Sequence, residues 1–360
     1  MIDLQALPSL APYGMDREEK RAFLTRELAD LCAYHAERCP EYGRILAAWG
    51  VDPGAADSFQ ALPILPERLF KDYALRSVPE TEVFKTMTSS GTTGQQVSKI
   101  FLDRETSAVQ SKVLTRIMSE FLGKQRLPMI ILDSSAVVKD PAMFSARGAG
   151  ILGFSMFARD KVYALDESMR LDTEGLKAFL EKHQGEDVFL FGFTFMIWQY
   201  FCAELRREGV CLDLSKGVLV HGGGWKKLAD QRISTERFKR ELRETCGLSR
   251  VHNYYGMVEQ TGAIYMECEC GHLHAPVWSD VTIRRPGDFS VAELGESGLI
   301  QVSSLLPRSY PGHILLTEDE GRLLGEDDCP CGRKGKYIEI AGRIKRAEVR
   351  GCSDTYEQRL

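Results

Sequence analysis

The 360-residue sequence lacks a long apolar run, an excess of basic residues and any internal repeat. Its longest uncharged run, residues 188–203, contains Gly192 and is shorter than the roughly 20 residues of a membrane-spanning helix. The N-terminus has no basic start followed by an apolar run, so we expect no secretory signal. Lys and Arg number 46 against 51 Asp and Glu, a net charge of -5 that argues against nucleic acid as a partner. These absences predict a soluble cytoplasmic protein without a membrane span.

The composition is that of a globular protein, with 44% hydrophobic and 27% charged residues. A chain of this length can bury a sizeable core as one large domain or as two smaller ones. Ten cysteines are present. In a cytoplasmic protein we expect them to be free thiols, metal ligands or nucleophiles rather than disulfides.

Hydrophobic periodicity predicts an α/β fold. Apolar residues recur at helical spacing in residues 15–49 and in residues 104–123. Three short apolar runs end in Gly or Asp and alternate with helical segments, which predicts buried parallel strands with functional loops at their carboxyl ends. These runs are residues 128–133, 188–192 and 217–224. From Val281 onward apolar and polar residues alternate in shorter stretches, which predicts an antiparallel subdomain.

The stretch "TSSGTTGQQVSKI", residues 88–100, combines hydroxyl residues, two glycines and a lysine. Such residues can bind phosphate through backbone N–H groups and hydroxyls. It is not a Walker loop, because Lys99 follows Gly94 at the wrong distance. A surface turn without a ligand has the same composition, so both interpretations stay open at this point.

Three further stretches point to a nucleotide site, each with a simpler alternative. "VHGGGWKKL" ends a predicted strand in three glycines, which suits either a flat ligand against the backbone or a plain turn. "HNYYGMVEQTG" joins paired aromatics to one carboxylate, offering a ring-stacking surface and a Mg²⁺ ligand. "LLTEDEGRL" places carboxylates after an apolar strand, where they can accept ribose hydroxyls or form a hairpin turn.

These motifs, in order, resemble the core motifs of the adenylate-forming superfamily. The series is "TSSGTTG", "GGGW", "YYGMVEQ", "LGESGLIQVSSL", "LLTEDEG" and "GRIKR", and it runs from residue 88 to residue 346. Within the superfamily the sequence resembles the phenylacetate-CoA ligase branch and, more narrowly, the acyl-protein synthetase family of bacterial bioluminescence fatty-acid reductase systems. The resemblance implies the large domain of an adenylate-forming enzyme: mainly parallel sheets flanked by helices, plus a smaller antiparallel β subdomain.

The resemblance also implies roles for individual residues. Glu259 would hold Mg²⁺, Asp319 would bind the ribose, and Arg343 would reach the ribose and phosphates. Lys99 would support the phosphate loop. The remaining ATP ligands would be Thr88, Ser89, Ser90, Gly91, Thr92, Thr93 and Gly94 at the phosphates, with Gly222, Gly223, Gly224, Tyr255 and Gly256 along the adenine. The sequence departs from the family at Val258, where the family usually has a Thr that contacts the α-phosphate; Thr261 is the candidate substitute.

The end of the sequence carries a second implication. After "GRIKR" only "AEVRGCSDTYEQRL" remains, so we expect the usual C-terminal small domain to be lacking. Acyl adenylates need an acceptor, and a thiolate attacks them readily. Cys352, in a short polar tail, resembles the cysteine that carries the acyl group as a thioester in the bioluminescence synthetases. The alternative is a cysteine that lies near the terminus by chance.

Two cysteine-rich segments, "MECECGHLHAP" and "DDCPCGRKG", predict a structural Zn²⁺ site. The expected ligands are Cys268, Cys270, Cys329 and Cys331. Because related phenylacetate-type ligases have a histidine after the first cysteine, His274 is the alternative to Cys270. Reduced thiols in a buried corner are the competing interpretation.

Other features allow only open interpretations. The aromatic stretches at residues 151–157 and 188–201 predict either an apolar acyl tunnel or ordinary core. His221 and His252 adjoin nucleotide motifs, where a histidine can orient phosphate or carboxylate or serve as a structural group, and neither is selected as a site residue. We divide the chain into an N-terminal helical portion, a core with the nucleotide motifs and the zinc site, and a tail with Cys352. Their bounds are 1–80, 81–346 and 347–360.

The predicted function is ATP-dependent activation of a carboxylic acid to acyl-AMP, followed by acyl transfer to a cysteine thiol, and the resemblance implies a fatty acid as the substrate. ATP, Mg²⁺ and structural Zn²⁺ are the expected cofactors. An acyl reductase or transferase is the expected acceptor, and a homo-oligomer is left open. The alternatives are an acyl- or aryl-CoA ligase of the phenylacetate type and a non-catalytic regulatory subunit that binds a nucleotide or an acyl group, for which Val258 argues.

Overall fold

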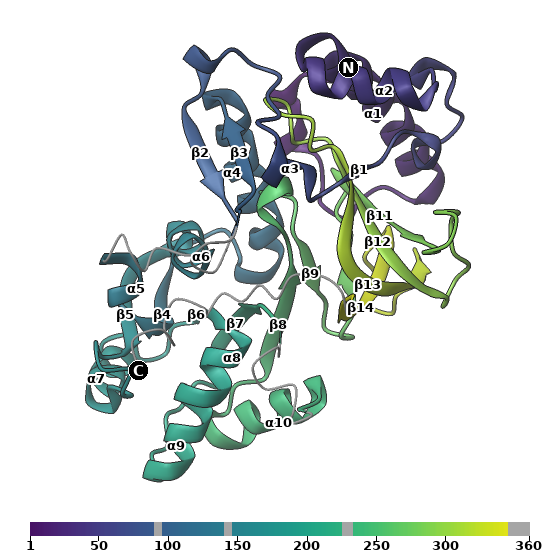
Figure 1. Ribbon diagram of the computed structural model, residues 1–360. Coiled ribbons are helices and arrows are strands. Elements are labelled where there is room, and N and C mark those ends of the chain that lie inside the picture. Colours follow the sequence, from purple (N-terminus) through teal and green to yellow (C-terminus); the bar gives the residue numbers. More distant parts are fainter. Residues whose placement is uncertain (90–95, 140–145, 225–232, 345–360) are drawn as a thin grey trace. The chain divides into compact units, whose positions relative to one another are not determined.

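The computed structural model describes residues 1–89, 96–139, 146–224 and 233–344 (Figure 1). The described residues form two compact units. Unit 1 comprises residues 1–89, 96–118 and 255–344, and unit 2 comprises residues 119–139, 146–224 and 233–254. The division at residues 80 and 346 made from the sequence stays a prediction.

Helices of unit 1 begin and end where local sequence signals place them. Helix α1 (Arg17–Arg38) starts after Asp16, whose carboxylate accepts a hydrogen bond from the Glu19 N–H at 3.0 Å. Pro40 is the first residue of α2 (Pro40–Trp49), which ends at the left-handed Gly50. The predicted helices at residues 15–49 and 104–123 are confirmed. The other helical elements that begin in this unit are η1 (Leu4–Ser9), η2 (Pro53–Ala55), η3 (Phe59–Ala61), α3 (Leu69–Asp72), η4 (Glu80–Glu82), α4 (Arg104–Leu122) and η9 (Val258–Gln260).

The strands of unit 1 are mainly antiparallel, as the alternating pattern after Val281 predicts. They run in the order β11-β12-β13-β14-β10-β9. Their bounds are β9 (Tyr265–Glu267), β10 (Leu273–His274), β11 (Ser279–Arg284), β12 (Ser297–Ser304), β13 (Ile314–Glu326) and β14 (Lys336–Arg343). Strand β1 (Leu65–Pro66) adds to β13 in parallel. A separate hairpin is formed by β2 (Lys85–Thr88) and β3 (Lys99–Leu102).

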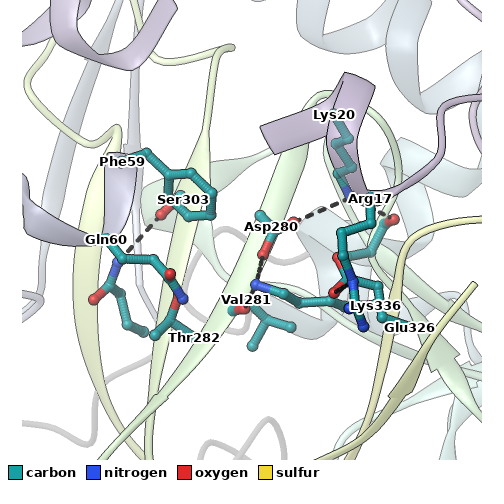
Figure 2. A network of polar contacts seen from close by, with 12 residues as sticks. Arg17, Lys20, Phe59, Gln60, Asp280, Val281, Thr282, Ser303, Glu326 and Lys336 are labelled. Atoms are coloured by element: carbon teal, nitrogen blue, oxygen red, sulfur yellow. Dashed lines mark hydrogen bonds and ion pairs between the residues drawn. The ribbon is translucent and has the colours of Figure 1, made fainter. Parts of the chain in front are cut away.

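A buried charge cluster joins helix α1 to the strands of unit 1 (Figure 2). The Asp280 carboxylate lies 2.7 Å from the Lys336 ammonium and 3.4 Å from the Lys20 ammonium. Lys20 also donates to the Ala275 carbonyl at 3.1 Å, and Lys336 donates to the Val281 carbonyl at 3.0 Å. Burial lowers the pKa of Lys20. Burial alone would raise the pKa of Asp280, but the two lysines outweigh it and hold that pKa below its usual value.

Unit 2 is built on a parallel sheet with the strand order β5-β4-β6-β7-β8. The strands are β4 (Leu127–Ser134), β5 (Ala158–Leu165), β6 (Val188–Phe193), β7 (Gly217–Gly222) and β8 (Arg250–Tyr255). Every residue of β6 and β7 is buried, as expected for parallel strands covered on both faces. The three strands predicted from apolar runs are therefore confirmed.

The helices of unit 2 lie along this sheet, with α7 beside β5 and α6 beside β6 (Figure 1). The helical elements are α5 (Ala136–Lys139), α6 (Ala146–Phe154), η6 (Ser155–Phe157), α7 (Thr173–Lys182), α8 (Thr194–Met196), the π-helical η7 (Ile197–Cys202), α9 (Ala203–Glu208) and α10 (Thr235–Cys246). Among the described residues, none of the helices has both the length and the apolar character needed to cross a membrane.

Aromatic side chains fill the core of unit 2. The rings of Phe154 and Phe191 stack with centroids 4.3 Å apart, and Tyr254 lies 5.2 Å from Phe154. Phe154 and Phe191 are almost fully buried, so these parts of the two aromatic stretches form core. A buried ion pair in the same unit joins Asp133 and Arg147 at 2.9 Å. Burial raises the pKa of Asp133 to about 6 even though Arg147 opposes that shift.

Candidate active site and metal centre

The β2–β3 hairpin holds both ends of the predicted phosphate loop. Thr88 lies opposite Lys99 in the register of the two strands, and both residues are exposed. The Ser89 N–H donates to the Ser98 carbonyl at 3.2 Å, and the Ser98 N–H donates to the Ser89 hydroxyl at 2.9 Å. The hairpin therefore brings Thr88, Ser89 and Lys99 together. The other loop residues, Ser90, Gly91, Thr92, Thr93 and Gly94, lie outside the described residues, as does Cys352.

The predicted Mg²⁺ ligand Glu259 is held by backbone contacts. Only 2% of Glu259 is exposed, and its carbonyl accepts a hydrogen bond from the Tyr310 hydroxyl at 2.9 Å. The next residue, Gln260, donates its amide to the Gly312 carbonyl at 2.8 Å. A Cβ at Gly312 would lie 2.8 Å from the Glu259 carbonyl, so glycine permits this close approach. No sequence motif pointed to Tyr310, which is distant from Glu259 along the chain.

Thr261, the candidate substitute for the missing threonine, forms a local hydrogen bond. The Thr261 hydroxyl donates to the Val258 carbonyl at 3.0 Å. This bond uses the single hydroxyl proton within the turn that follows η9. The role of Thr261 as a substitute stays a prediction.

Three of the predicted nucleotide ligands lie together in unit 1. The Tyr255 hydroxyl donates to the Asp319 carboxylate at 2.8 Å, and burial together with Asp319 raises the pKa of Tyr255. Asp319 lies opposite Arg343 in the β13–β14 register, with 3.5 Å between the carboxylate and the guanidinium. Arg343 also pairs with Glu67 at 3.1 Å and with Glu318 at 3.4 Å. Gly256 follows Tyr255 and is exposed.

Glu67 was not found by sequence reasoning. It is 4% exposed and lies next to β1, where its N–H donates to the Leu316 carbonyl of β13 at 2.9 Å. Its segment carries no motif, and it meets Arg343 only because β1 adds to β13. A buried carboxylate can fix the direction of a guanidinium, so Glu67 orients Arg343 from the side of β1.

The glycines Gly222, Gly223 and Gly224 lie at the carboxyl end of β7 in unit 2. A Cβ at Gly222 would lie 2.5 Å from the Tyr254 ring, so no side chain fits there. Gly223 has φ +80°, a conformation that favours glycine. The Tyr254 ring thus requires glycine at position 222, and the backbone conformation favours it at position 223. The carboxyl end of a parallel strand is the usual position of a ligand site.

A cysteine–histidine cluster lies in unit 1. The ligand atoms of its four members lie within 4.8 Å of one another, and they are Cys268, His274, Cys329 and Cys331. The Cys268 and Cys329 sulfurs are 3.8 Å apart, and the Cys331 sulfur lies 3.4 Å from His274 Nε2. Cys270 is exposed and is not a member. The structure therefore groups the alternative His274, rather than Cys270, with the three other cysteines.

Matching turns present the cysteines of this cluster. In each Cys-x-Cys-Gly segment the glycine N–H donates to the carbonyl of the first cysteine at 3.0 Å, from Gly271 to Cys268 and from Gly332 to Cys329. Both glycines have positive φ, +83° and +81°. His272, which sequence reasoning did not select, places Nδ1 at 3.2 Å from the Cys329 sulfur. A histidine at this distance can orient a thiolate ligand.

The chain is similar to known proteins over most of its length. A family model described as "Acyl-protein synthetase, LuxE" matches residues 2–360. The chain is 23% identical over 363 residues to the long-chain-fatty-acid–luciferin-component ligase of Vibrio harveyi, with 96% of this chain and 90% of the relative covered. It is 38% identical over 333 residues to the phenylacetate-coenzyme A ligase of Thermus thermophilus, with 89% of this chain and 69% of the relative covered.

Solved structures show the same fold. A 2-hydroxyisobutyryl-CoA ligase in complex with 2-HIB-AMP and CoA superposes with a TM-score of 0.72 at 18% identity, covering 98% of this chain and 75% of that chain. Its open conformation gives a TM-score of 0.69, covering 95% and 79%. The fold expected from the motif series is confirmed. The chain belongs to the acyl-protein synthetase family LuxE and is an acyl-adenylate-forming ligase.

Proposed function

We propose that the protein activates a fatty acid with ATP and then carries the acyl group on Cys352. The carboxylate attacks the α-phosphate, so that acyl-AMP forms and pyrophosphate leaves. The Cys352 thiolate then attacks the acyl carbon: a carbon–sulfur bond forms, the bond to AMP breaks, and AMP leaves with the electron pair. A partner acyl reductase would take the acyl group from the thioester. Support comes from the family and from two relatives named long-chain-fatty-acid–luciferin-component ligases, from Vibrio harveyi and Aliivibrio fischeri.

The observation that carries the proposal is the grouping of Tyr255, Asp319 and Arg343. These residues come from separate motifs, yet the Asp319 carboxylate lies 2.8 Å from the Tyr255 hydroxyl and 3.5 Å from the Arg343 guanidinium. A carboxylate fixed in this way is set to accept the hydroxyls of a ribose, and the adjacent cation favours phosphate. Lys99, exposed at the end of the hairpin, would add positive charge at the pyrophosphate.

Glu259 fits the role of a Mg²⁺ ligand. Mg²⁺ binds oxygen ligands and is usually held by one or two carboxylates together with substrate phosphates. Glu259 supplies a carboxylate on a segment fixed by Tyr310 and Gln260. The ion would neutralise charge on the triphosphate when bound.

Mass spectrometry of the intact protein tests the transfer step. We expect MgATP and a panel of fatty acids to give a hydroxylamine-labile acyl mass on the wild type and on Cys211→Ser, a control variant that removes an exposed cysteine of the described residues. Cys352→Ser should release pyrophosphate without carrying the adduct. An adduct that persists in Cys352→Ser would place the acceptor elsewhere.

A CoA ligase is the second candidate, because the phenylacetate-coenzyme A ligase of Thermus thermophilus is 38% identical. AMP release that depends on CoA and survives Cys352→Ser would favour it. Acyl transfer that needs no CoA and depends on Cys352 would favour the acyl-protein synthetase. The localisation in the cytoplasm stays a prediction.

We also propose that Cys268, His274, Cys329 and Cys331 hold a structural Zn²⁺. Zn–S bonds of about 2.3 Å in a tetrahedron place sulfurs about 3.8 Å apart, and the Cys268 and Cys329 sulfurs are separated by 3.8 Å. Four protein ligands leave no open position for chemistry. Elemental analysis should find about one zinc per chain in wild type and in Cys270→Ser, and a large loss in Cys268→Ser. Equal zinc content in the two variants would contradict this ligand set.

A further inference from the structure

Thr194 makes polar contacts with the glycine turn at the end of β7. It follows strand β6, and only 3% of it is exposed. Its hydroxyl oxygen lies 2.8 Å from the Gly223 carbonyl and 3.1 Å from the Gly222 carbonyl. The same oxygen lies 2.9 Å from Nδ1 of His221, which is also 3% exposed. One buried hydroxyl therefore meets both carbonyls of the turn and one ring nitrogen.

The available protons determine which group donates and which accepts in each of these hydrogen bonds. A hydroxyl has one proton, and carbonyl oxygens only accept, so the Thr194 proton serves the glycine carbonyls. His221 Nδ1 must then donate to the Thr194 oxygen. Burial lowers the pKa of His221 to about 3, so the neutral ring carries its single proton on Nδ1. The result is a chain of donors from His221 through Thr194 to Gly223.

This chain fixes the direction of the backbone. Every described peptide bond is trans, so each N–H points opposite to the carbonyl of its own peptide plane. With the carbonyls of Gly222 and Gly223 directed at Thr194, the N–H groups of Gly223 and Gly224 point away from Thr194. The Tyr254 ring and the φ of +80° at Gly223 leave the turn little freedom to reverse.

We propose that Thr194, oriented by His221, is a positioning residue that holds Gly222 and Gly223 in the conformation that binds the adenine of ATP. The two N–H groups directed away from Thr194 are donors suited to the ring nitrogens of a purine, which accept hydrogen bonds. Thr194 itself touches only the protein. The inference rests on the proposed function, since the adenine is that of the ATP used in that function.

Isosteric substitutions at Thr194 test the inference. Thr194→Val keeps the shape and removes the hydroxyl, and Thr194→Ser keeps the hydroxyl. We expect Thr194→Val to raise the Kd and the KM for ATP by about three- to tenfold, the size of one lost hydrogen bond, while kcat and the KM for the fatty acid change less than twofold. Thr194→Ser and the control Thr115→Val, which removes a hydroxyl bonded to the Ser111 carbonyl in α4, should bind ATP as the wild type does.

A second pair of variants covers the case in which Thr194→Val does not fold. His221→Asn retains an N–H donor near Nδ1, and His221→Leu removes it. ATP affinity should fall in His221→Leu and be kept in His221→Asn. Equal ATP affinity across both pairs, or equal losses in Thr194→Val and Thr194→Ser, would overturn the inference.

The test separates this inference from the proposed function. Titration calorimetry measures ATP binding without turnover. A wild type that binds ATP but never forms an acyl adduct would end the proposed function, while the ratio of Kd values would still decide the role of Thr194. Normal acyl transfer with an unchanged Kd in Thr194→Val would end the inference alone.

Discussion

Asp280 in unit 1 and Asp133 in unit 2 are both buried carboxylates paired with cations, yet their pKa values move in opposite directions. Asp280 meets two lysines, and its pKa is lowered although burial opposes that shift. Asp133 meets one arginine, and burial raises its pKa to about 6. The number of cationic partners, rather than burial, separates the two cases. A buried carboxylate is stable as an anion when the attraction of its partners exceeds the cost of desolvation.

The largest effect should come from removing the carboxylate of the doubly paired cluster. Asp280→Asn leaves Lys20 and Lys336 buried without a counter-charge, which should cost about 3–5 kcal/mol of the free energy of unfolding. Urea unfolding followed by circular dichroism measures the loss.

Two further variants serve as a control and as a partial rescue. Glu37→Gln removes a carboxylate that is 74% exposed and should stay within about 0.5 kcal/mol of the wild type. Adding Lys20→Met to Asp280→Asn removes one of the two unpaired ammonium groups, so it should recover part of the loss. If Asp280→Asn lowers the free energy of unfolding no more than Glu37→Gln does, the two lysines do not stabilise Asp280 as an anion, and the comparison with Asp133 fails.

A smaller effect, with a defined pH window, is expected for Asp133. Its carboxyl has a pKa of about 6 when folded and 3.8 as the reference value. Between these values the unfolded chain has lost the proton and the folded protein keeps it, so stability falls as the pH rises from about 4 to about 6. The change amounts to about 3 kcal/mol and is complete above pH 6. Relative to the wild type, Asp133→Asn should gain stability across this window.

The aspartates should also differ in the sign of their pH dependence. Because the pKa of Asp280 is lowered, its contribution is present above the unfolded pKa and is lost as the pH falls. Urea unfolding from pH 2 to pH 7 of wild type, Asp133→Asn and Asp280→Asn measures both slopes, because the contribution of Asp280 is lost only below its reference pKa of 3.8. If the free energies of unfolding of wild type and Asp133→Asn differ by the same amount at every pH, folding does not raise the pKa of Asp133. The attraction of Arg147 would then fully offset the cost of burial.

The smallest effect should come from a buried hydrogen bond between uncharged groups. Tyr310→Phe removes the bond to the Glu259 carbonyl and should cost about 1 kcal/mol. If Tyr310 positions Glu259, the Mg²⁺ concentration for half-maximal pyrophosphate release should also rise. Tyr265→Phe, which loses a similar bond to the Asp280 carbonyl, is the matched control and should leave the Mg²⁺ requirement unchanged. The same Mg²⁺ response in both variants would contradict the positioning role.

Strands that are buried on both faces were readable from the sequence, whereas an edge strand was not. The run "VFLFG" predicts β6 because every position is apolar. Strand β5 lies at the end of the strand order beside β4 and alternates exposed and half-buried positions through Arg159, Asp160 and Lys161, so its sequence resembles a polar loop. The π-helical η7 was not predicted either, since its sequence, IWQYFC, lies within a long uncharged run that shows no clear helical period.

The candidate site was predictable where ligands lie within motifs and unpredictable where they meet across the chain. Asp319 and Tyr255 were selected from their own segments, and the structure joins them. Glu67 and Arg343 are 276 residues apart, so only tertiary structure brings them together. The grouping of His274 rather than Cys270 with the other cysteines depends on the turn at Gly271. The spacing of cysteines in the sequence does not show in which direction each side chain points.

The contacts of helix α1 have a consequence for the order in which the chain folds. Lys20 meets the Ala275 carbonyl across 255 residues, and Arg17 meets Glu326 across 309 residues. At about 5–20 residues per second, a ribosome takes roughly 15–60 s to add that much chain. Helix α1 can form early, because its hydrogen bonds are local. The residues that it packs against are synthesised last. The apolar face of α1 therefore stays exposed during most of synthesis. A chaperone that binds amphipathic helices would have the longest time to bind this helix.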